Sequence, residues 1–444
     1  MNNRSAIYFT GRSPWFFTII CAIIIAVSCT NVARAEKLTL PEGIKIVTEE
    51  NGLIKIKQQE ESISEADTLI ARSGLLPHAD AKYGQVHTEM QPGVIIGNQS
   101  APTAERSFYT YSLAIQQLLY DFGGVSSYYE ASKRILETKQ LDTKRMKNYM
   151  ALQFALTYYD LLEAEKMVTV ASGEKERLDI HLANAKTLYD EGVITKNDLL
   201  QAEIKLSDAQ QKLLTAQNLK NIRHSQLNNL LARPLSTKIE TEETNIVFAN
   251  EIDLDKAQES AEKDRYEMKI IDTTLQAVKS EESAKKSEYL PRFFLEGRYD
   301  YTKNKYQVHE GLFGVMVGMN INFLNGGSTR AGLSKIAGQK QRLLTERKKL
   351  IDDIRLDVER YYLEMASAQE KVKVTKGAIT QAEENLRINK VKYGDGVGTA
   401  TDVIDAITLL TVAETNYYRS LYEYNRAYAG LMHATGKDLL EIYK

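Results

Sequence analysis

The chain has 444 residues, and its 57 Lys and Arg residues almost balance its 59 Asp and Glu residues, giving a net charge of -2. Hydrophobic residues make up 43%, with only 7 prolines and 2 cysteines, which excludes collagen-like, disordered and disulfide-stapled proteins. Because the charge is nearly neutral, the chain offers no general basic surface, and nucleic acid is not expected as a partner.

Residues 1–35 are predicted to be a signal peptide. They combine a positive start, an apolar run of 13 residues at 15–27 and the small-x-small sequence Ala33-Arg34-Ala35. A membrane-spanning helix needs about 20 apolar residues, which favours cleavage, but an N-terminal anchor and lipidation at Cys29 remain as alternatives. Both cysteines lie in this leader, so the exported chain must be held together without disulfides.

The first repeat, residues 36–233, is predicted to contain short helices, two strands and a long helical hairpin. Hydrophobicity alternates weakly over residues 79–85 and 109–117, which is the period of a strand. Residues 125–188 then predict a helix about 100 Å long, at about 1.5 Å per residue, which is too long for a compact globule. After a turn at 189–194, Thr195 and Asp198 have the spacing of a capping box that starts a second helix.

A polar linker, residues 234–251, leads to a second repeat, residues 252–444, with the same order of elements. Its long helix is predicted at 328–392, and the helix after each turn has coiled-coil heptad spacing. Several residues of the first repeat recur in the same order in the second, and so many ordered matches are improbable by chance, which indicates a duplication. At one offset of 204, the residues Tyr189, Gly192, Val193, Thr195 and Asp198 recur as Tyr393, Gly396, Val397, Thr399 and Asp402.

The clearest strands are those of the second repeat, at 293–301 and 313–323, where apolar residues occupy the odd positions. At about ten residues with this alternation, they have the length of barrel strands that cross an outer membrane. An ordinary amphipathic sheet over a soluble core is the alternative. No later run of about 20 apolar residues could form a transmembrane helix. The residues predicted to face lipid are Val315, Val317, Met319 and Ile321.

Four strands cannot close a pore, because about eight are needed merely to leave room for side chains. A homotrimer would combine three sets of four strands, or about twelve, and would leave no exposed strand edge. The predicted fold class is therefore mainly α with a membrane β-barrel portion. Each protomer would supply four strands and long coiled-coil hairpins from two tandem repeats.

These features resemble the TolC-like outer membrane efflux proteins across the whole exported chain. The resemblance rests on the start at residues 38–43, Leu75-Leu76-Pro77, the Gly-Gly pairs that open the long helices, and the duplicated Tyr-x-x-Gly and Thr-x-x-Asp turns. It implies a trimeric channel-tunnel in the outer membrane that extends through the periplasm. It also implies a periplasmic adaptor (membrane fusion protein), an inner-membrane transporter and outer membrane lipid as partners, for efflux or type I secretion. A periplasmic adaptor and a secreted coiled-coil structural protein remain as alternatives.

The resemblance also implies a periplasmic gate. Asp402 and Asp405 are spaced to share one helix face, and they match the family's paired aspartates at the constriction. Tyr393 and Asp198 match its inter-helix hydrogen-bonding pair, whereas Gly398 stands where the family usually has Arg. A plain helix-start role for Asp402 is the alternative.

The two turns are predicted to contact the adaptor, through Gly192 and Val193 in one and Gly396 and Val397 in the other, unless the glycines serve only the turn.

Catalytic chemistry has little support, and neither enzyme activity nor a cofactor is expected. The six histidines share no ligand spacing, so we expect them at scattered surface or barrel positions rather than in a metal site. No phosphate-binding loop or nucleophile motif occurs. The aromatic residues expected in a membrane girdle are Tyr83, Tyr109, Tyr111, Tyr299 and Tyr301, and those expected between helices are Tyr158, Tyr159, Tyr361 and Tyr362.

Overall fold

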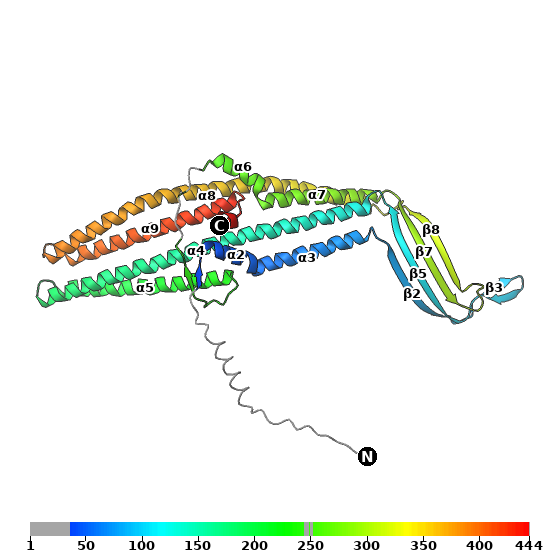
Figure 1. Cartoon of the computed structure of the whole chain (residues 1–444), viewed down its shortest axis with the longest axis horizontal. Helices are drawn as coiled ribbons and strands as arrows, with labels where there is room; N and C mark the ends of the chain where they lie inside the picture. The colour runs from blue at the N-terminus through cyan, green and yellow to red at the C-terminus, as the bar shows by residue number, and fades with distance from the viewer. Residues whose placement is uncertain (1–35, 244–247, 249–251, 444) are drawn as a thin grey trace, which may run out of the picture.

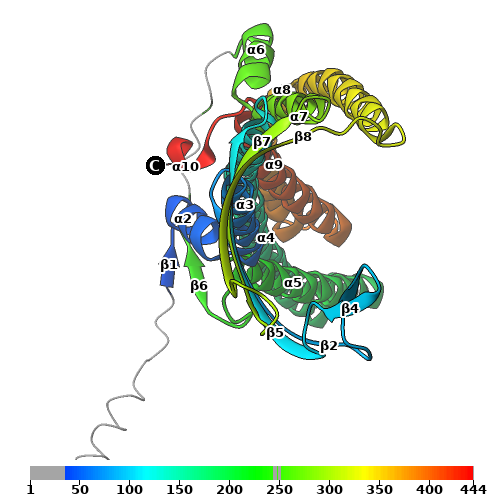
Figure 2. The same cartoon turned by 90° about the vertical axis from the view of Figure 1, so that its right-hand side faces the viewer.

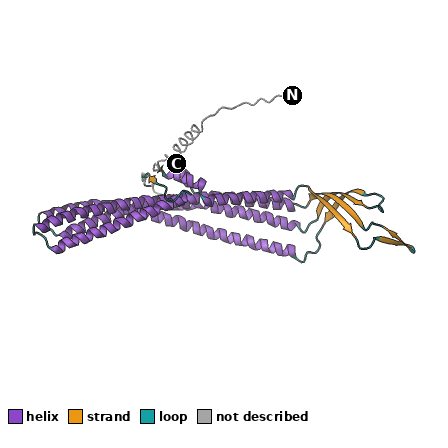
Figure 3. Ribbon diagram, turned by 90° about the horizontal axis from the view of Figure 1, so that it is seen from below, coloured by secondary structure: helices purple, strands orange, loops and turns teal. Residues whose placement is uncertain are grey.

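The computed structural model describes residues 36–243, 248 and 252–443, arranged as a rod of helices with a β-sheet at one end (Figures 1 and 3). The predictions of a leader at 1–35 and of lipidation at Cys29 fall outside the described residues, as does part of the 234–251 linker. Within the described part, no helix has the length and apolar character needed to cross a membrane.

The order of elements repeats, as the sequence predicted. The four helices of each repeat have equal lengths of 11, 22, 67 and 35 residues. The first repeat contains α2 (Leu40–Glu50), α3 (Gly52–Ser73), β2 (His78–His87), β5 (Ser107–Tyr120), α4 (Gly124–Asp190) and α5 (Lys196–Leu230). The second contains α6 (Leu254–Asp264), α7 (Tyr266–Ser287), β7 (Arg292–Lys303), β8 (Gly311–Asn320), α8 (Ser328–Gly394) and α9 (Ala400–Ala434).

Four shorter strands and one short helix complete the described chain. Strands β1 (Glu36–Leu38) and β6 (Ile239–Thr241) pair in parallel near the middle of the rod. Strands β3 (Gly93–Ile96) and β4 (Gln99–Pro102) form a hairpin beyond the sheet, which the sequence pattern did not predict (Figure 1). The last helix is α10 (Leu439–Ile442).

The main sheet has the order β2-β5-β7-β8 with every pair antiparallel, and Figure 2 shows it as a curved band. The predicted strand at 313–323 is wrong at its end, because β8 stops at Asn320. Its neighbour β7 begins at Arg292, which is already paired with Asn320, so no partner remains for the following residues. Ile321 therefore lies in the connection between β8 and α8.

Each long helix begins after two consecutive residues in the left-handed region, where the chain turns from a strand into the helix. In the first repeat these are Phe122 (φ 55°) and Gly123 (φ 84°), and in the second Gly326 (φ 63°) and Gly327 (φ 82°). Glycine adopts this conformation without steric cost, whereas a bulky side chain adopts it rarely. The two repeats thus share one backbone turn built from different residues.

The largest core cluster surrounds the middle of α4, where Phe154 and Tyr158 are fully buried. Gly43 of α2 lies against the Phe154 ring, so closely that a β-carbon there would overlap it. The Tyr158 hydroxyl accepts a hydrogen bond from the Glu242 backbone N–H at 2.9 Å, and it lies 3.0 Å from the Leu38 carbonyl oxygen. Tyr158 and Tyr159 thus pack between helices as predicted.

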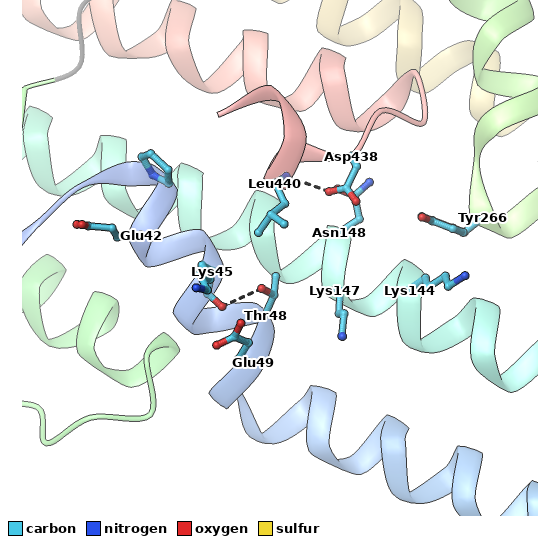
Figure 4. Close-up of a pocket in the computed structure, with 11 residues that line it drawn as sticks. Glu42, Lys45, Thr48, Glu49, Lys144, Lys147, Asn148, Tyr266, Asp438 and Leu440 are labelled. Atoms are coloured by element: carbon cyan, nitrogen blue, oxygen red, sulfur yellow. Dashed lines mark hydrogen bonds between the residues drawn. The ribbon is translucent and has the colours of Figure 1, made fainter. Parts of the chain in front are cut away.

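A pocket of about 550 Å³ lies where α2 and α4 approach α7 and α10 (Figure 4). Asn148 in its wall accepts a hydrogen bond from the Leu439 backbone N–H at 3.1 Å and donates one to the Lys437 carbonyl at 3.0 Å. These bonds fasten the segment after α9 to α4. Since both polar atoms of this amide are used, its role here is structural.

Burial of His433 predicts a loss of stability in acid. Burial first, and then the positive charge of Arg265, lower the pKa of His433 to about 4. Histidine in an unfolded chain has a pKa of about 6.5. Between about pH 6.5 and about pH 4, His433 therefore binds a proton in the unfolded state but not in the folded state. The free energy of unfolding should decrease by about 3 kcal/mol over that range.

Chemical denaturation of the purified protein across this pH range would measure the effect. His433→Gln should flatten the pH dependence, whereas the control His78→Gln, at an exposed position, should leave it unchanged. An equally steep decrease in both variants would contradict this account.

Candidate functional site: one sheet face and two hairpin ends

The register of the main sheet brings the odd-numbered residues of all four strands onto one face, as far as an irregularity between Leu118 and Tyr120 of β5. Val317 pairs with Leu295, Gln117 of β5 pairs with that same Leu295, and Ala79 of β2 pairs with Ile115 of β5. Directly paired residues in antiparallel strands point to the same side. Val315, Val317 and Met319 therefore share an exposed, mainly apolar face.

The five tyrosines predicted for a girdle also lie on this face, toward the end of the sheet away from the helices. Tyr83 lies 5.3 Å from Tyr111 between ring centroids, and Tyr111 lies 5.8 Å from Tyr301. Aromatic rings that combine apolar faces with a polar hydroxyl are typical of a boundary between apolar and aqueous surroundings.

The opposite face of the sheet carries most of its charges, and Lys303 at the end of β7 is the exception among the Lys, Arg, Asp and Glu residues of the four strands. Arg298 lies 3.3 Å from the Asp300 carboxylate and 3.9 Å from that of Glu296. These residues occupy even positions of β7, as Asp80 and Lys82 do in β2. These charges of β2 and β7 therefore lie opposite the apolar face, whereas the even positions of β8 carry no charge.

The two hairpins end in matching turns at the opposite end of the rod from the sheet (Figure 1). Gly192 (φ 74°) and Gly396 (φ 72°) take the left-handed conformation that ends each long helix. The Val193 N–H then donates to the Leu188 carbonyl at 2.8 Å, and the Val397 N–H to the Lys392 carbonyl at 3.0 Å. Both valine side chains are exposed.

The predicted capping boxes are present at the start of α5 and α9. The Asp402 carboxylate accepts hydrogen bonds from the Thr399 hydroxyl at 2.7 Å and from its backbone N–H at 2.9 Å, and these bonds lower the pKa of Asp402. Asp198 makes the same contacts with Thr195 at 2.7 and 3.0 Å. Asp405, one turn further along α9, is exposed. Asp402 and Asp198 therefore have a helix-capping role within the protomer.

Tyr393 lies between the two hairpins and is only 6% exposed. Its hydroxyl has no hydrogen-bond partner among the described residues, so the expected bond to Asp198 is not formed in this protomer. Burial and then the negative charge of Asp198 raise the pKa of Tyr393. The charge of Asp198 thus acts on Tyr393, although no hydrogen bond joins the two side chains in the protomer.

His181 of α4 faces Tyr393, with ring centroids 5.3 Å apart, and was not singled out by the sequence. The expectation of a surface or barrel position is wrong for this histidine, which is 3% exposed, with Nε2 unpartnered among the described residues. Burial and then Lys390 lower the pKa of His181. Both rings line a pocket of about 300 Å³ near the hairpin ends. Its position one helical turn beyond Arg177 and two turns beyond Glu174, which places all three on one side of α4, was the available signal.

Glu174 and Arg177 connect α4 to the neighbouring helices on the same side. Glu174 is buried and pairs with Lys212 of α5 at 2.7 Å, and Arg177 pairs with Glu414 of α9 at 2.9 Å. The Glu174 pair joins the two helices of the first hairpin, whereas the Arg177 pair, like the contact of His181 with Tyr393, joins the first hairpin to the second. Within the described ranges, no group of three or more His, Cys, Asp or Glu residues could hold a metal ion.

Comparisons with known proteins agree with this arrangement. The family model described as outer membrane efflux protein matches residues 49–233 and 252–437, one match for each repeat. A membrane protein from Pseudomonas aeruginosa is similar in structure, with a TM-score of 0.79 and 16% identity over 90% of both chains.

The outer membrane protein VceC of Vibrio cholerae aligns with a TM-score of 0.78 and 14% identity, over 90% of this chain and 96% of that one. The CmeC outer membrane channel of Campylobacter jejuni aligns with a TM-score of 0.78 and 13% identity, over 89% and 85%. A search among curated protein sequences finds no match.

Proposed function

The chain belongs to the outer membrane efflux protein family, and on that premise we propose that it is the outer membrane channel of a tripartite export system. Members of this family are channels rather than enzymes. In this system an inner-membrane transporter and a periplasmic adaptor would deliver substrates, by efflux or type I secretion. The observation that carries the proposal is a sheet with one apolar face attached to two equal helical hairpins.

The open edges of the sheet support a proposal that the chain forms an oligomer. Among the described residues, strands β2 and β8 each have one edge without a partner strand, and exposed edges of this kind promote association. Pairing β8 of one protomer with β2 of the next would close a barrel from three copies. The protomer alone cannot enclose a pore, because closure needs about eight strands or more. We therefore propose a homotrimer.

In that trimer the odd-numbered face of the sheet would contact outer membrane lipid and the charged face would line the pore. The lipid-facing residues would include Val315, Val317 and Met319. Ile321, in the connection after β8, would lie at the edge of the membrane. The alternatives of a periplasmic adaptor or a secreted coiled-coil protein do not account for this four-stranded sheet.

Substitutions on the two faces of β8 test the membrane proposal. Val317→Arg would place a charge in lipid, at a cost of about 2 to 4 kcal/mol near the bilayer midplane, and should reduce membrane insertion. Asn320→Arg, on the opposite face, should be tolerated better. Outer membrane fractionation and the yield of heat-sensitive trimer on a gel measure both outcomes. Equal tolerance at the two positions would reject this orientation of the sheet.

The hairpin ends are the proposed contact with the adaptor. Their exposed valines lie on rigid turns at the far end of helices about 100 Å long, where a partner can reach them. Replacing Val193 and Val397 by Trp should abolish export while trimers still form in the membrane, because the turns are made by glycines and backbone bonds. The readouts are export from cells and trimer yield. Normal export in the double variant would argue against docking at these ends.

The helix starts next to the hairpin ends are the proposed periplasmic gate, formed by Asp402, Asp405, Tyr393 and Asp198. In a trimer, Asp402 and Asp405 would form two rings of three carboxylates. Converging carboxylates attract cations, so the entrance should select cations and be blocked by multivalent ones. Since Asp402 uses one oxygen for its cap, Asp405 has the freer carboxylate.

Single-channel recording tests the gate. Asp402→Asn with Asp405→Asn should remove block by multivalent cations, and Tyr393→Phe should open more readily. Thr399→Ala is the matched control, because it removes the capping hydroxyl, at about 1 kcal/mol of helix stability, and keeps both carboxylates. Block should persist in that control. Unchanged conductance and block in the aspartate and tyrosine variants would refute the gate.

A further inference from the structure

The pocket of about 300 Å³ between the hairpins contains two polar atoms whose hydrogen bonds are not made within the chain. His181 Nε2 and the Tyr393 hydroxyl both lack a partner in the part of the chain that the structure describes, and both side chains are more than nine-tenths buried. A buried polar atom without a partner costs free energy, so each such atom needs an explanation. The larger pocket beside α10 differs, because the buried amide of Asn148 in its wall is fully bonded.

Comparison of the repeats shows that the hairpins themselves do not require this buried pair. Tyr189 is the counterpart of Tyr393 at the offset of 204 residues, and it is 38% exposed. The counterpart of His181 at the same offset is Asn385. The first hairpin therefore forms with its tyrosine exposed, and the second forms with asparagine in place of histidine. The pair is a feature of the space between the hairpins.

The charge within the pocket is positive. Lys390 is the one Lys, Arg, Asp or Glu residue among the described residues that line it. Burial and then the charge of Lys390 lower the pKa of His181, so this ring stays neutral at neutral pH. Asp198 acts on Tyr393 with a negative charge, but its carboxylate is already bonded in the cap of α5.

The surrounding charges have both signs and do not line the pocket. Glu174 and Arg177, further along α4, are each engaged in an ion pair. The charged residues of the hairpin ends outside the lining include Lys186, Asp190, Lys392, Asp395 and Asp402. The nearest group that could attract a ligand charge is therefore Lys390, whose charge reaches the buried ring of His181.

The rest of the lining is suited to the apolar part of a small molecule. Leu188 of α4 and Val403 of α9 lie in its wall, together with Ile180, which is half exposed. Ligand pockets are typically apolar with a few convergent polar groups, and their volumes begin at about 300 Å³. The pocket thus fits a small ligand with an apolar body and one polar end.

We propose that this pocket binds a small organic carboxylate, with the carboxylate at His181 and Tyr393 and the apolar body against Ile180 and Leu188. The Tyr393 hydroxyl donates one hydrogen bond to it, His181 donates a second from Nε2–H, and Lys390 adds its positive charge. The ligand touches α4, α8 and α9 at once, and so joins the two hairpins. Its further effect, which is to hold the gate closed, rests on the proposed function.

Cysteine labelling can locate the ligand, because both cysteines of the chain lie in the predicted leader. In the exported chain purified in detergent, Asn184→Cys would place a thiol in the pocket wall, and Glu191→Cys would place one outside it at the hairpin end. The probes are benzoate, phenylacetate and isovalerate, with benzamide as the neutral control. We expect the carboxylates to slow maleimide labelling at 184 saturably, benzamide to have little effect, and labelling at 191 to stay unchanged.

Calorimetric titration with benzoate tests the proposed contacts. Tyr393→Phe and Lys390→Gln should each weaken binding about tenfold or more, because a hydrogen bond or charge to the carboxylate is lost. His181→Leu should weaken it similarly, and His181→Gln, which keeps an N–H donor, should restore part of it. Tyr189→Phe is the matched control, since it removes the equivalent hydroxyl outside the pocket, and it should leave the affinity unchanged.

Two results would overturn the carboxylate site. One is a lack of saturable protection at 184 by all three carboxylates, or equal protection by benzamide. The other is equal benzoate affinity in Tyr393→Phe and Tyr189→Phe, which would mean that benzoate binds elsewhere.

Single-channel recording separates the site from the gate. Benzoate should reduce opening of the unmodified protein and have no effect on Lys390→Gln. Binding with unchanged opening would support the site and overturn its effect on the gate. If benzoate does not bind while multivalent cations still block the channel, the site is refuted and the proposed function stands. If benzoate binds but the protein forms no conducting channel, the proposed function fails and the site stands.

Discussion

Packing along α4 is the interaction on which the rest of the protomer depends. This one helix contacts α2, α3, α5, α7, α9 and α10, and its middle carries the fully buried Phe154, Tyr158 and Leu161. Helices of this length cannot fold back on themselves, so they are stable only where an apolar side finds a partner. Through α4 the first repeat supplies the shared core of both repeats.

Helix α8 is the counterpart of α4 in the second repeat and has the same length, but it contacts fewer helices. It contacts mainly α9, with α6 and α7 along part of its length, and Leu356, Leu363 and Val374 remain exposed. The unequal burial of α4 and α8 would be explained if another protomer supplied the remaining neighbours of α8. The trimer proposed here would cover the side of α8 that the first repeat does not.

Sequence patterns predicted the helices, the four principal strands and both capping boxes, because these depend on local spacing. Patterns could not give contacts between residues far apart in the chain. His181 meets Tyr393 across 212 positions only after both hairpins fold. Asp198 had two expected partners, Tyr393 from the family pattern and Thr195 from the capping box. Spacing alone does not decide between them, and in the structure the Asp198 carboxylate bonds to Thr195. The end of β8 depended on where its partner strand begins.

The equal helix lengths of the two repeats have a consequence for how such a chain can evolve. Deleting one residue from a helix turns everything beyond it by about 100° and shortens it by about 1.5 Å. In α4 that change would move the heptad positions out of register with α5 and draw one hairpin end back from the other. Insertions and deletions would therefore be tolerated only in whole heptads and in all four hairpin helices together. Substitution of exposed side chains leaves this register unchanged, so the constraint acts on the length of the rod and not on its surface.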